Sequence, residues 1–133
     1  MRDNDWLNNR LENIWKLLFS DVERQNKVNA RFKGKWRNKF GHIKILKDKS
    51  SEIAVNSLFQ NELIPEYIID ITLAHELTHY SHGFNSPLPK KYKHPHKGGI
   101  VNRELTKRGF EKMVILEKDF IKNKWFGLYR LLK

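Results

Sequence analysis

Hydrophobic residues near the start of the chain recur three or four positions apart, with mostly polar residues between them. This spacing places side chains on one face of a helix, so it predicts an amphipathic N-terminal helix. Either Asn4 or Asp5 is expected to cap the first turn. The apolar face would consist of Leu7, Leu11, Ile14, Leu18 and Val22.

The next part of the chain alternates between hydrophobic and polar residues, which predicts strands. Gly41–Ile45 and Glu52–Asn56 both alternate, and Lys47–Ser50 between them has residues typical of a turn. A first short strand is expected around Trp36, within Arg31–Phe40. Together these segments predict a short three-stranded sheet.

A largely apolar segment follows, and its length favours a helix. Pro65 suits the first turn of this helix, and Gly83 supplies a stop just beyond the last turn. Apolar residues cover most of the circumference, namely Ile68, Ile69, Ile71, Thr72, Leu73, Ala74 and Leu77. Such a helix is normally buried, so its polar side chains would lie at the floor of a cleft.

The polar residues within this helix form the pattern His-Glu-x-x-His, at His75, Glu76 and His79. Residues four apart lie on one helical face, about 6 Å apart along the axis, so the two imidazoles can converge on one cation. Zinc lowers the pKa of a bound water to about 7, and Glu76 is near enough to take its proton. The pattern therefore predicts a metal-dependent hydrolase, with His75 and His79 as ligands of Zn²⁺ and Glu76 as the catalytic acid and base.

A catalytic zinc site generally needs a third protein ligand. His94 and His96 lie in a loop with enough proline and glycine to turn back over the cleft, and Glu104 lies beyond this loop. We rank His96 first, then His94, then Glu104. His82 lies about 10 Å further along the motif helix than its first histidine, which favours a role at the helix C-terminus instead.

The residues that lead into the motif resemble those of a known family. Leu63–Asp70, continuing into Ile71–His79, is similar to the core of the SprT-like zinc metalloproteases, the group that includes Spartan. The resemblance covers roughly residues 30 to 109. It implies an α+β fold: a small zincin-like metalloprotease domain with an N-terminal helix, a short three-stranded sheet, the motif helix and C-terminal helices.

The same resemblance implies His96 as the third metal ligand. The family usually has His-Gly-x-x-Phe at this point, whereas this chain reads His96-Lys97-Gly98-Gly99-Ile100, and His94 aligns with similar ease. The chain contains no cysteine, so the resemblance does not extend to the zinc-ribbon tail that some relatives carry.

The rest of the chain is expected to be helical. A short helix is expected from about Ile100 to Arg108, ending at Gly109, and one or two amphipathic helices within Phe110–Lys133 are expected to dock on the core.

The length fits one domain spanning residues 1–133. No apolar run approaches a membrane span of roughly 18 residues, and the charged start lacks the apolar segment of a secretory signal. We expect a cytoplasmic protein that does not contact a membrane.

The net charge of +11 is unevenly distributed. Arg31–Lys49 has eight basic residues against one acidic residue, and Lys90–Lys133 has thirteen against four. Ser50–Pro89, which contains the motif, has five acidic residues and no lysine or arginine. The acidic centre favours a divalent cation.

The basic flanks are either a DNA- or RNA-binding surface or simply solvated lysines. The aromatic residues expected to stack on bases are Trp36, Phe40, Tyr92, Trp125 and Tyr129.

The predicted activity is hydrolysis of peptide bonds in a protein or peptide substrate. An extended substrate is expected to pair with the strand Glu52–Asn56, and Tyr80, Tyr92 or a histidine would stabilise the oxyanion. One alternative is a metal-dependent hydrolase of a non-peptide bond. The other is a basic nucleic-acid-binding module with a structural metal.

Overall fold

The structure is a computed structural model that describes residues 1–133, and it has an α+β architecture, as the sequence predicts. Its helices and strands are α1 (Asn4–Leu18), β1 (Val28–Phe32), β2 (Gly41–Ile45), β3 (Ser51–Val55), α2 (Glu66–Ser81), α3 (Ile100–Leu105), α4 (Glu111–Phe120) and α5 (Phe126–Leu132). The shorter helical segments are η1 (Ser57–Gln60), η2 (Lys97–Gly99), η3 (Thr106–Phe110) and η4 (Ile121–Trp125). The N-terminal helix, the motif helix and the C-terminal helices all form.

The cap of α1 differs from the expectation. Asp3, rather than Asn4 or Asp5, caps the helix by accepting a hydrogen bond of 2.8 Å from the backbone N–H of Trp6. Asn4 is already the first helical residue, and its side chain accepts a 2.9 Å hydrogen bond from the N–H of Phe32 in β1. The start of α1 is therefore attached to the sheet.

The strand order is β1-β3-β2, with β1 parallel and β2 antiparallel to β3. The expected strand around Trp36 is wrong, because residues 33–40 form a loop, in which Gly34 has a φ of +75°. The first strand instead covers Val28–Phe32, in which buried and exposed residues alternate. The expected strands Gly41–Ile45 and Glu52–Asn56 match β2 and, within one residue, β3.

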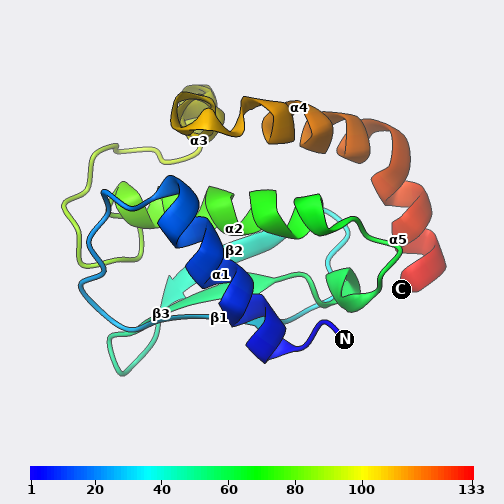
Figure 1. The fold of residues 1–133 in the computed structure, drawn as a ribbon, viewed down its shortest axis with the longest axis horizontal. Coiled ribbons are helices and arrows are strands. Elements are labelled where there is room, and N and C mark those ends of the chain that lie inside the picture. The colour runs from blue at the N-terminus through cyan, green and yellow to red at the C-terminus, as the bar shows by residue number, and fades with distance from the viewer.

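Helix α2 lies between the sheet and the C-terminal helices (Figure 1). It packs on β2 and β3 on one side and against α3 and α4 on the other, while α1 contacts both β1 and α2. Because α2 has neighbours on both sides, nearly every residue from Ile68 to Tyr80 is buried. The expectation of a buried motif helix is confirmed.

The C-terminal helices dock on this core through aromatic residues, as expected. Trp125 is 1% exposed, its ring centroid lies 5.1 Å from that of Phe40 and 5.6 Å from that of Phe59, and its indole N–H donates to the carbonyl of Arg37 at 2.7 Å. A side chain so deeply buried cannot stack on a nucleic-acid base, so this part of the expectation is wrong. None of the helices combines the length and hydrophobicity needed to cross a bilayer.

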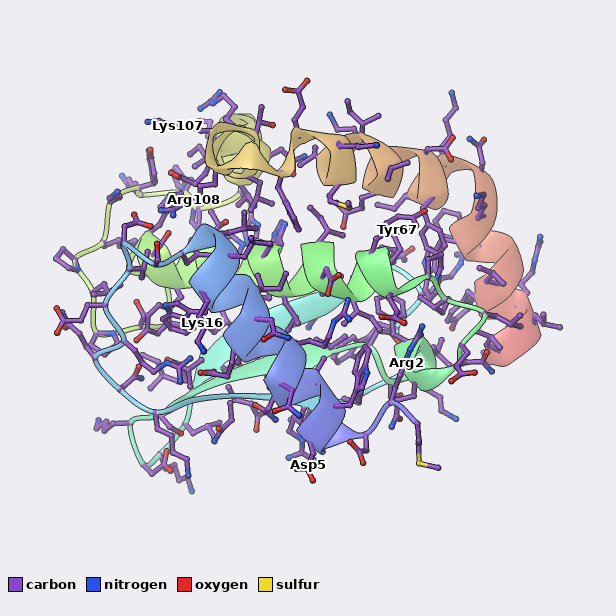
Figure 2. All side chains as sticks on the ribbon, in the orientation of Figure 1. Arg2, Asp5, Lys16, Tyr67, Lys107 and Arg108 are labelled. Carbon is purple, nitrogen blue, oxygen red and sulfur yellow. The ribbon has the colours of Figure 1, made fainter.

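A second set of contacts fastens the segment after α3 to the end of α1. Arg108 donates hydrogen bonds to the carbonyl of Leu18 at 2.8 Å and to the carboxylate of Asp21 at 2.7 Å, and its Nε atom donates to Glu104 at 3.0 Å. Its neighbour Lys107 projects away from the ribbon (Figure 2). Arg108 therefore connects the first and last thirds of the chain.

Candidate metal centre

Local sequence places the two motif histidines on successive turns of α2. The helix begins directly after Pro65, whose fixed φ of −62° suits the residue before the first turn. It ends at His82, and Gly83 then adopts a φ of +77°, which a residue with a side chain rarely adopts. Pro65 and Gly83 therefore mark the two ends of the helix, close to where the sequence predicts them.

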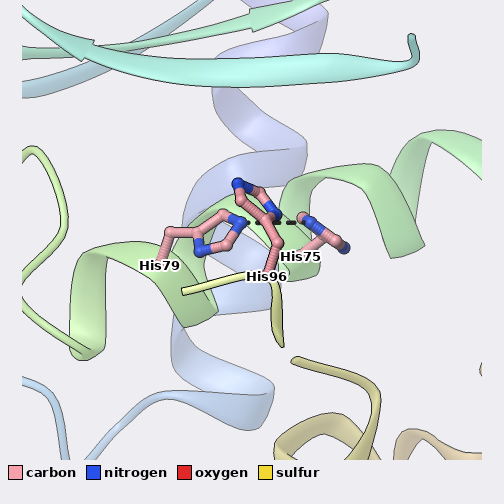
Figure 3. Close-up of side chains that lie close together, drawn as sticks. All are labelled: His75, His79 and His96. Atoms are coloured by element: carbon pink, nitrogen blue, oxygen red, sulfur yellow. Dashed lines mark hydrogen bonds between the residues drawn. The ribbon is translucent and has the colours of Figure 1, made fainter. Parts of the chain in front are cut away.

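The structure brings His75, His79 and His96 together (Figure 3). The Nε2 atoms of His75 and His79 lie 3.2 Å apart, and the three possible ligand atoms all lie within 4.8 Å of one another. The first two rings project from α2, whereas the ring of His96 comes from the loop before η2. Residues 17 positions apart in the sequence thus form one cluster of imidazoles.

The environment of His75 and His79 keeps these two imidazoles neutral. Burial, with a smaller contribution from His96, lowers the pKa of His75 to about 4. Burial, followed by the neighbouring histidines, lowers the pKa of His79 to about 3. A neutral imidazole has a free lone pair, which is the form that binds a metal. Both motif histidines are therefore in the metal-binding form at neutral pH.

The donor set suits a zinc ion. Two nitrogen ligands of a tetrahedral zinc site, each 2.0–2.1 Å from the ion, lie about 3.3 Å apart, close to the observed Nε2 separation of 3.2 Å. The Nδ1 atom of His79 is buried without a hydrogen-bond partner, and the one polar contact of its ring is that of Nε2 with Nε2 of His75. Calcium and magnesium prefer oxygen ligands, so three imidazoles favour zinc or another transition metal.

The other candidate ligands lie elsewhere. Glu104 accepts a hydrogen bond from Arg108 and its Oε1 lies 3.2 Å from Nε2 of His82, so it belongs to the polar contacts between α2 and α3. His82 is buried at the end of α2, in the structural position that the sequence favours. His94 is exposed and is not part of the cluster. Among the ranked candidates for third ligand, only His96 meets the motif histidines.

Glu76 lies beside the imidazoles and is 4% exposed. Its burial raises the pKa of the carboxyl group to about 8, although nearby Lys39 opposes this shift. The backbone of Gly41 in β2 lies nearby: an added Cβ would lie 3.5 Å from Oε2 of Glu76, 2.9 Å from Thr72 and 2.7 Å from the carbonyl oxygen of Ala54. Any side chain at this position would therefore touch Glu76 and clash with Thr72 and with β3.

A cavity of about 400 Å³ opens beside His75 and Glu76. Gly41 and Thr72 complete the wall next to the motif, and Glu117 of α4 lines the cavity from the C-terminal side. The remaining wall residues are Arg37, Asn38, Lys39, Phe40, Ile121, Trp125 and Phe126. The sequence reading missed Gly41 and Glu117, since one is an ordinary strand glycine and the other one of many charged residues on an amphipathic helix.

Two expectations about the substrate are contradicted. Strand β3 is central and paired on both sides, so it cannot receive a further strand, and the edge beside α2 is β2. Tyr80 is completely buried, and its hydroxyl donates to Asn26 at 2.7 Å and accepts from the N–H of Gln25 at 3.2 Å, so it cannot reach an oxyanion at the histidine cluster.

Hydrogen bonding decides which groups of β2 remain open at the edge. The carbonyl of Phe40 accepts a hydrogen bond from the N–H of Asn56, and the N–H of Leu46 donates to the carbonyl of Ser50. In an antiparallel pair, every second residue bonds to the partner strand. The N–H and C=O groups of Gly41, Ile43 and Ile45 therefore point away from β3. The carbonyl of Ile43 accepts a hydrogen bond of 2.8 Å from Asn85. The open stretch next to Glu76 is therefore centred on Gly41.

No protein-family model, curated protein or solved structure matches the chain.

Proposed function

We propose that the protein is a zinc-dependent peptidase of the SprT-like, zincin-like type. The observation that carries this proposal is the convergence of three imidazoles from His75, His79 and His96, with the buried carboxylate of Glu76 beside them in an open cleft. Structural zinc sites use four protein ligands, whereas three protein ligands leave a position for water, as catalysis requires.

The three histidines would hold the ion, and a bound Zn²⁺ would lower the pKa of water and polarise the substrate carbonyl. Glu76 accepts a proton on its carboxylate from the attacking water and returns it to the departing amine nitrogen. Burial raises the pKa of Glu76 to about 8 in the metal-free protein, and a cation bound beside it would lower this pKa and favour the ionised carboxylate that accepts the proton.

The edge strand β2 orients the substrate. Its outward N–H and C=O groups at Gly41 can pair with an extended peptide, which then passes in front of Glu76. The absence of a side chain at Gly41 lets the substrate backbone approach closely. Asn85 already occupies the carbonyl of Ile43, so pairing is confined to the end of β2 next to Glu76.

A second role, association with DNA or RNA, rests on how two basic segments meet. The guanidinium of Arg37 lies 5.4 Å from the ring of Phe126, which brings the loop of residues 33–40 next to the lysine-rich C-terminal helices. Lys39, Lys122 and Lys124 are exposed in the same two segments. We propose that they contact phosphates, and that the substrates include proteins bound to nucleic acid.

The activity is tested with zinc-loaded protein and an unstructured protein such as casein, with products identified by mass spectrometry. We expect cleavage that a chelator abolishes and added zinc restores. Glu76→Gln should retain one zinc and lose cleavage by a factor of at least a hundred, whereas the exposed Glu62→Gln should behave as wild type. Cleavage of DNA or RNA but not of casein would establish the non-peptide hydrolase instead. Salt-sensitive DNA binding with no hydrolysis would establish the binding module.

A further inference from the structure

Glu117 is a carboxylate without a partner on the wall of the cavity. It forms no hydrogen bond or ion pair within the molecule, although its side chain is only partly exposed to solvent. The neighbouring residues on its face of the helix are apolar: Met113, Val114, Phe120 and Ile121. No lysine or arginine is therefore three or four positions away to pair with it.

A buried carboxylate without a partner is unfavourable, and a bound cation relieves the cost. Burial raises the pKa of Glu117 to about 7, which reports the same cost. Structural carboxylates in this molecule do have partners, as Glu104 does with Arg108 at 3.0 Å. Glu117 differs in facing a cavity rather than a neighbouring side chain.

The cavity wall contains two cations, and both are turned to aromatic rings. The ammonium group of Lys39 lies 4.6 Å from the ring centroid of Trp36, which is not a wall residue, and the guanidinium of Arg37 lies 5.4 Å from that of Phe126. Both side chains are exposed, whereas Glu117 is only partly exposed. The acidic groups of the cavity therefore lie inside it, and its cations lie at the outer rim.

The remaining walls suit the hydrocarbon part of a long side chain. Phe40, Ile121 and Trp125 provide apolar surface next to Glu117, and a volume of about 400 Å³ exceeds that of one lysine or arginine side chain. Such side chains place a methylene stem against apolar surface and a charged head beyond it. The cavity therefore provides apolar surface for the methylene stem of a basic side chain and a carboxylate, that of Glu117, for its charged end.

We propose that this cavity binds a lysine or arginine side chain of the peptide substrate, with the carboxylate of Glu117 pairing with its charged end. The inference rests on the proposed peptidase function, because the cavity opens beside Glu76 and His75. It identifies the substrate class as peptides with a basic residue next to the bond that is cut. Glu117 acts as a specificity residue and takes no part in proton transfer.

Binding is measured without turnover, using zinc-loaded Glu76→Gln protein and short blocked alanine peptides with a central lysine, arginine, norleucine or glutamate. This background also removes the only other carboxylate in the cavity wall. We expect calorimetry to give the lysine and arginine peptides a ten- to hundredfold lower Kd than the norleucine peptide. Adding Glu117→Gln should reduce this preference to less than about threefold.

The matched control is Glu111→Gln, which removes an exposed carboxylate from the same helix and should leave the preference unchanged. Glu117→Lys provides a second variant and should favour the glutamate peptide. Equal affinities for the lysine and norleucine peptides, a preference that survives Glu117→Gln, or no binding of any peptide at millimolar concentration would each overturn the proposal.

Failure of this proposal is distinguishable from failure of the proposed activity. Casein cleavage by the wild-type protein without a preference for basic residues would leave the peptidase and remove the role of Glu117. Conversely, tight binding of lysine peptides that depends on Glu117, without cleavage of any peptide by the wild type, would leave the cavity assignment and remove the peptidase.

Discussion

Gly41 in the edge strand lies against Glu76 in the motif helix, at a distance where an added methyl group would just touch the carboxylate. An added Cβ would lie 3.5 Å from Oε2 of Glu76 and 2.7 Å from the carbonyl oxygen of Ala54 in the neighbouring strand. The second distance is shorter than real Cβ contacts allow, so the strand would have to move. The width of the cleft at Glu76 thus depends on this glycine.

Replacing Gly41 by alanine should therefore impair catalysis. We expect peptidase activity to fall at least tenfold, because β2 must shift to relieve the clashes with Ala54 and Thr72, and this shift misplaces the substrate relative to Glu76. Overpacking should also lower the free energy of unfolding by about 1–3 kcal/mol. Zinc affinity should stay within about threefold of wild type, because none of the three histidines is touched.

The control for this change is Gly127→Ala, at a helical glycine in α5 with no other atoms within 4 Å of the added Cβ. This variant should keep full activity and gain a few tenths to about 1 kcal/mol of stability through the higher helix propensity of alanine. Activity rates and urea unfolding provide both measurements. Wild-type activity in Gly41→Ala would show that the cleft does not depend on this contact.

The third ligand can be tested by exchanging the two loop histidines separately. His96→Ala should weaken zinc binding by at least about a hundredfold, since one of three protein ligands is lost, whereas His94→Ala should change it less than about threefold. Calorimetric titration gives both affinities. Zinc at a hundred times its Kd should stabilise the wild-type protein by about 2.7 kcal/mol, and this increment should nearly disappear in His96→Ala. The reverse order of effects would make His94 the ligand.

The sequence predicts the motif helix best, because its signals agree with one another. Pro65, a long apolar run and Gly83 all indicate the same helix. In the structure this helix begins directly after Pro65 and ends shortly before Gly83. The sequence does not reveal the first strand because Val28–Phe32 is short and its exposed residues, Asn29 and Arg31, are types that are also common in loops. Trp36 and Phe40, in the segment where a strand was expected, pack on the rings of His42 and Phe59 and take no part in strand pairing.

The candidate site was predictable only where it is local in sequence. A spacing of four residues on one helix fixes the relation of His75 to His79, whereas the position of His96 depends on a loop whose path no short-range pattern specifies. The edge position of β2 likewise follows from strand order, which depends on long-range pairing. Glu117 became recognisable only once its helix had a place beside the cavity.

Burial of Glu117 has a consequence for stability that depends on pH. Its pKa rises from 4.5 to about 7 on folding, so between these values the unfolded chain has lost a proton that the folded protein keeps. Stability therefore falls as the pH rises through this window, and the full cost of about 1–3 kcal/mol is present above pH 7. Glu117→Gln removes this cost.

We expect Glu117→Gln to have nearly wild-type stability at pH 5 and to be more stable than wild type at pH 8. The groups that face Glu117 across the cavity, Arg37, Lys39, His75 and Glu76, remain in both proteins. Their effects largely cancel when the two proteins are compared at each pH. Urea unfolding of metal-free protein measures the difference, and Glu111→Gln should show no such dependence. A constant difference across this range would mean that Glu117 titrates normally.

Arg108 should contribute strongly to stability, although it is not part of the histidine cluster. It bonds to the carbonyl of Leu18, to Asp21 and to Glu104, so three separate groups lose a partner when it is removed. Its guanidinium also lies 4.5 Å from the ring centroid of Phe19. Arg108→Met should lower the free energy of unfolding by about 2–3 kcal/mol, with most of the loss arising from the polar groups left without partners.

The adjacent Lys107→Met provides the matched control, because Lys107 is exposed and forms no hydrogen bond or ion pair. It removes the same formal charge and should change stability by less than about 0.5 kcal/mol. The hydrogen bond with Arg108 holds the pKa of Asp21 below its usual value, so the wild-type advantage over Arg108→Met should shrink as the pH falls through that lowered value. Equal losses in the two variants would mean that net charge, rather than the contacts of Arg108, determines the effect.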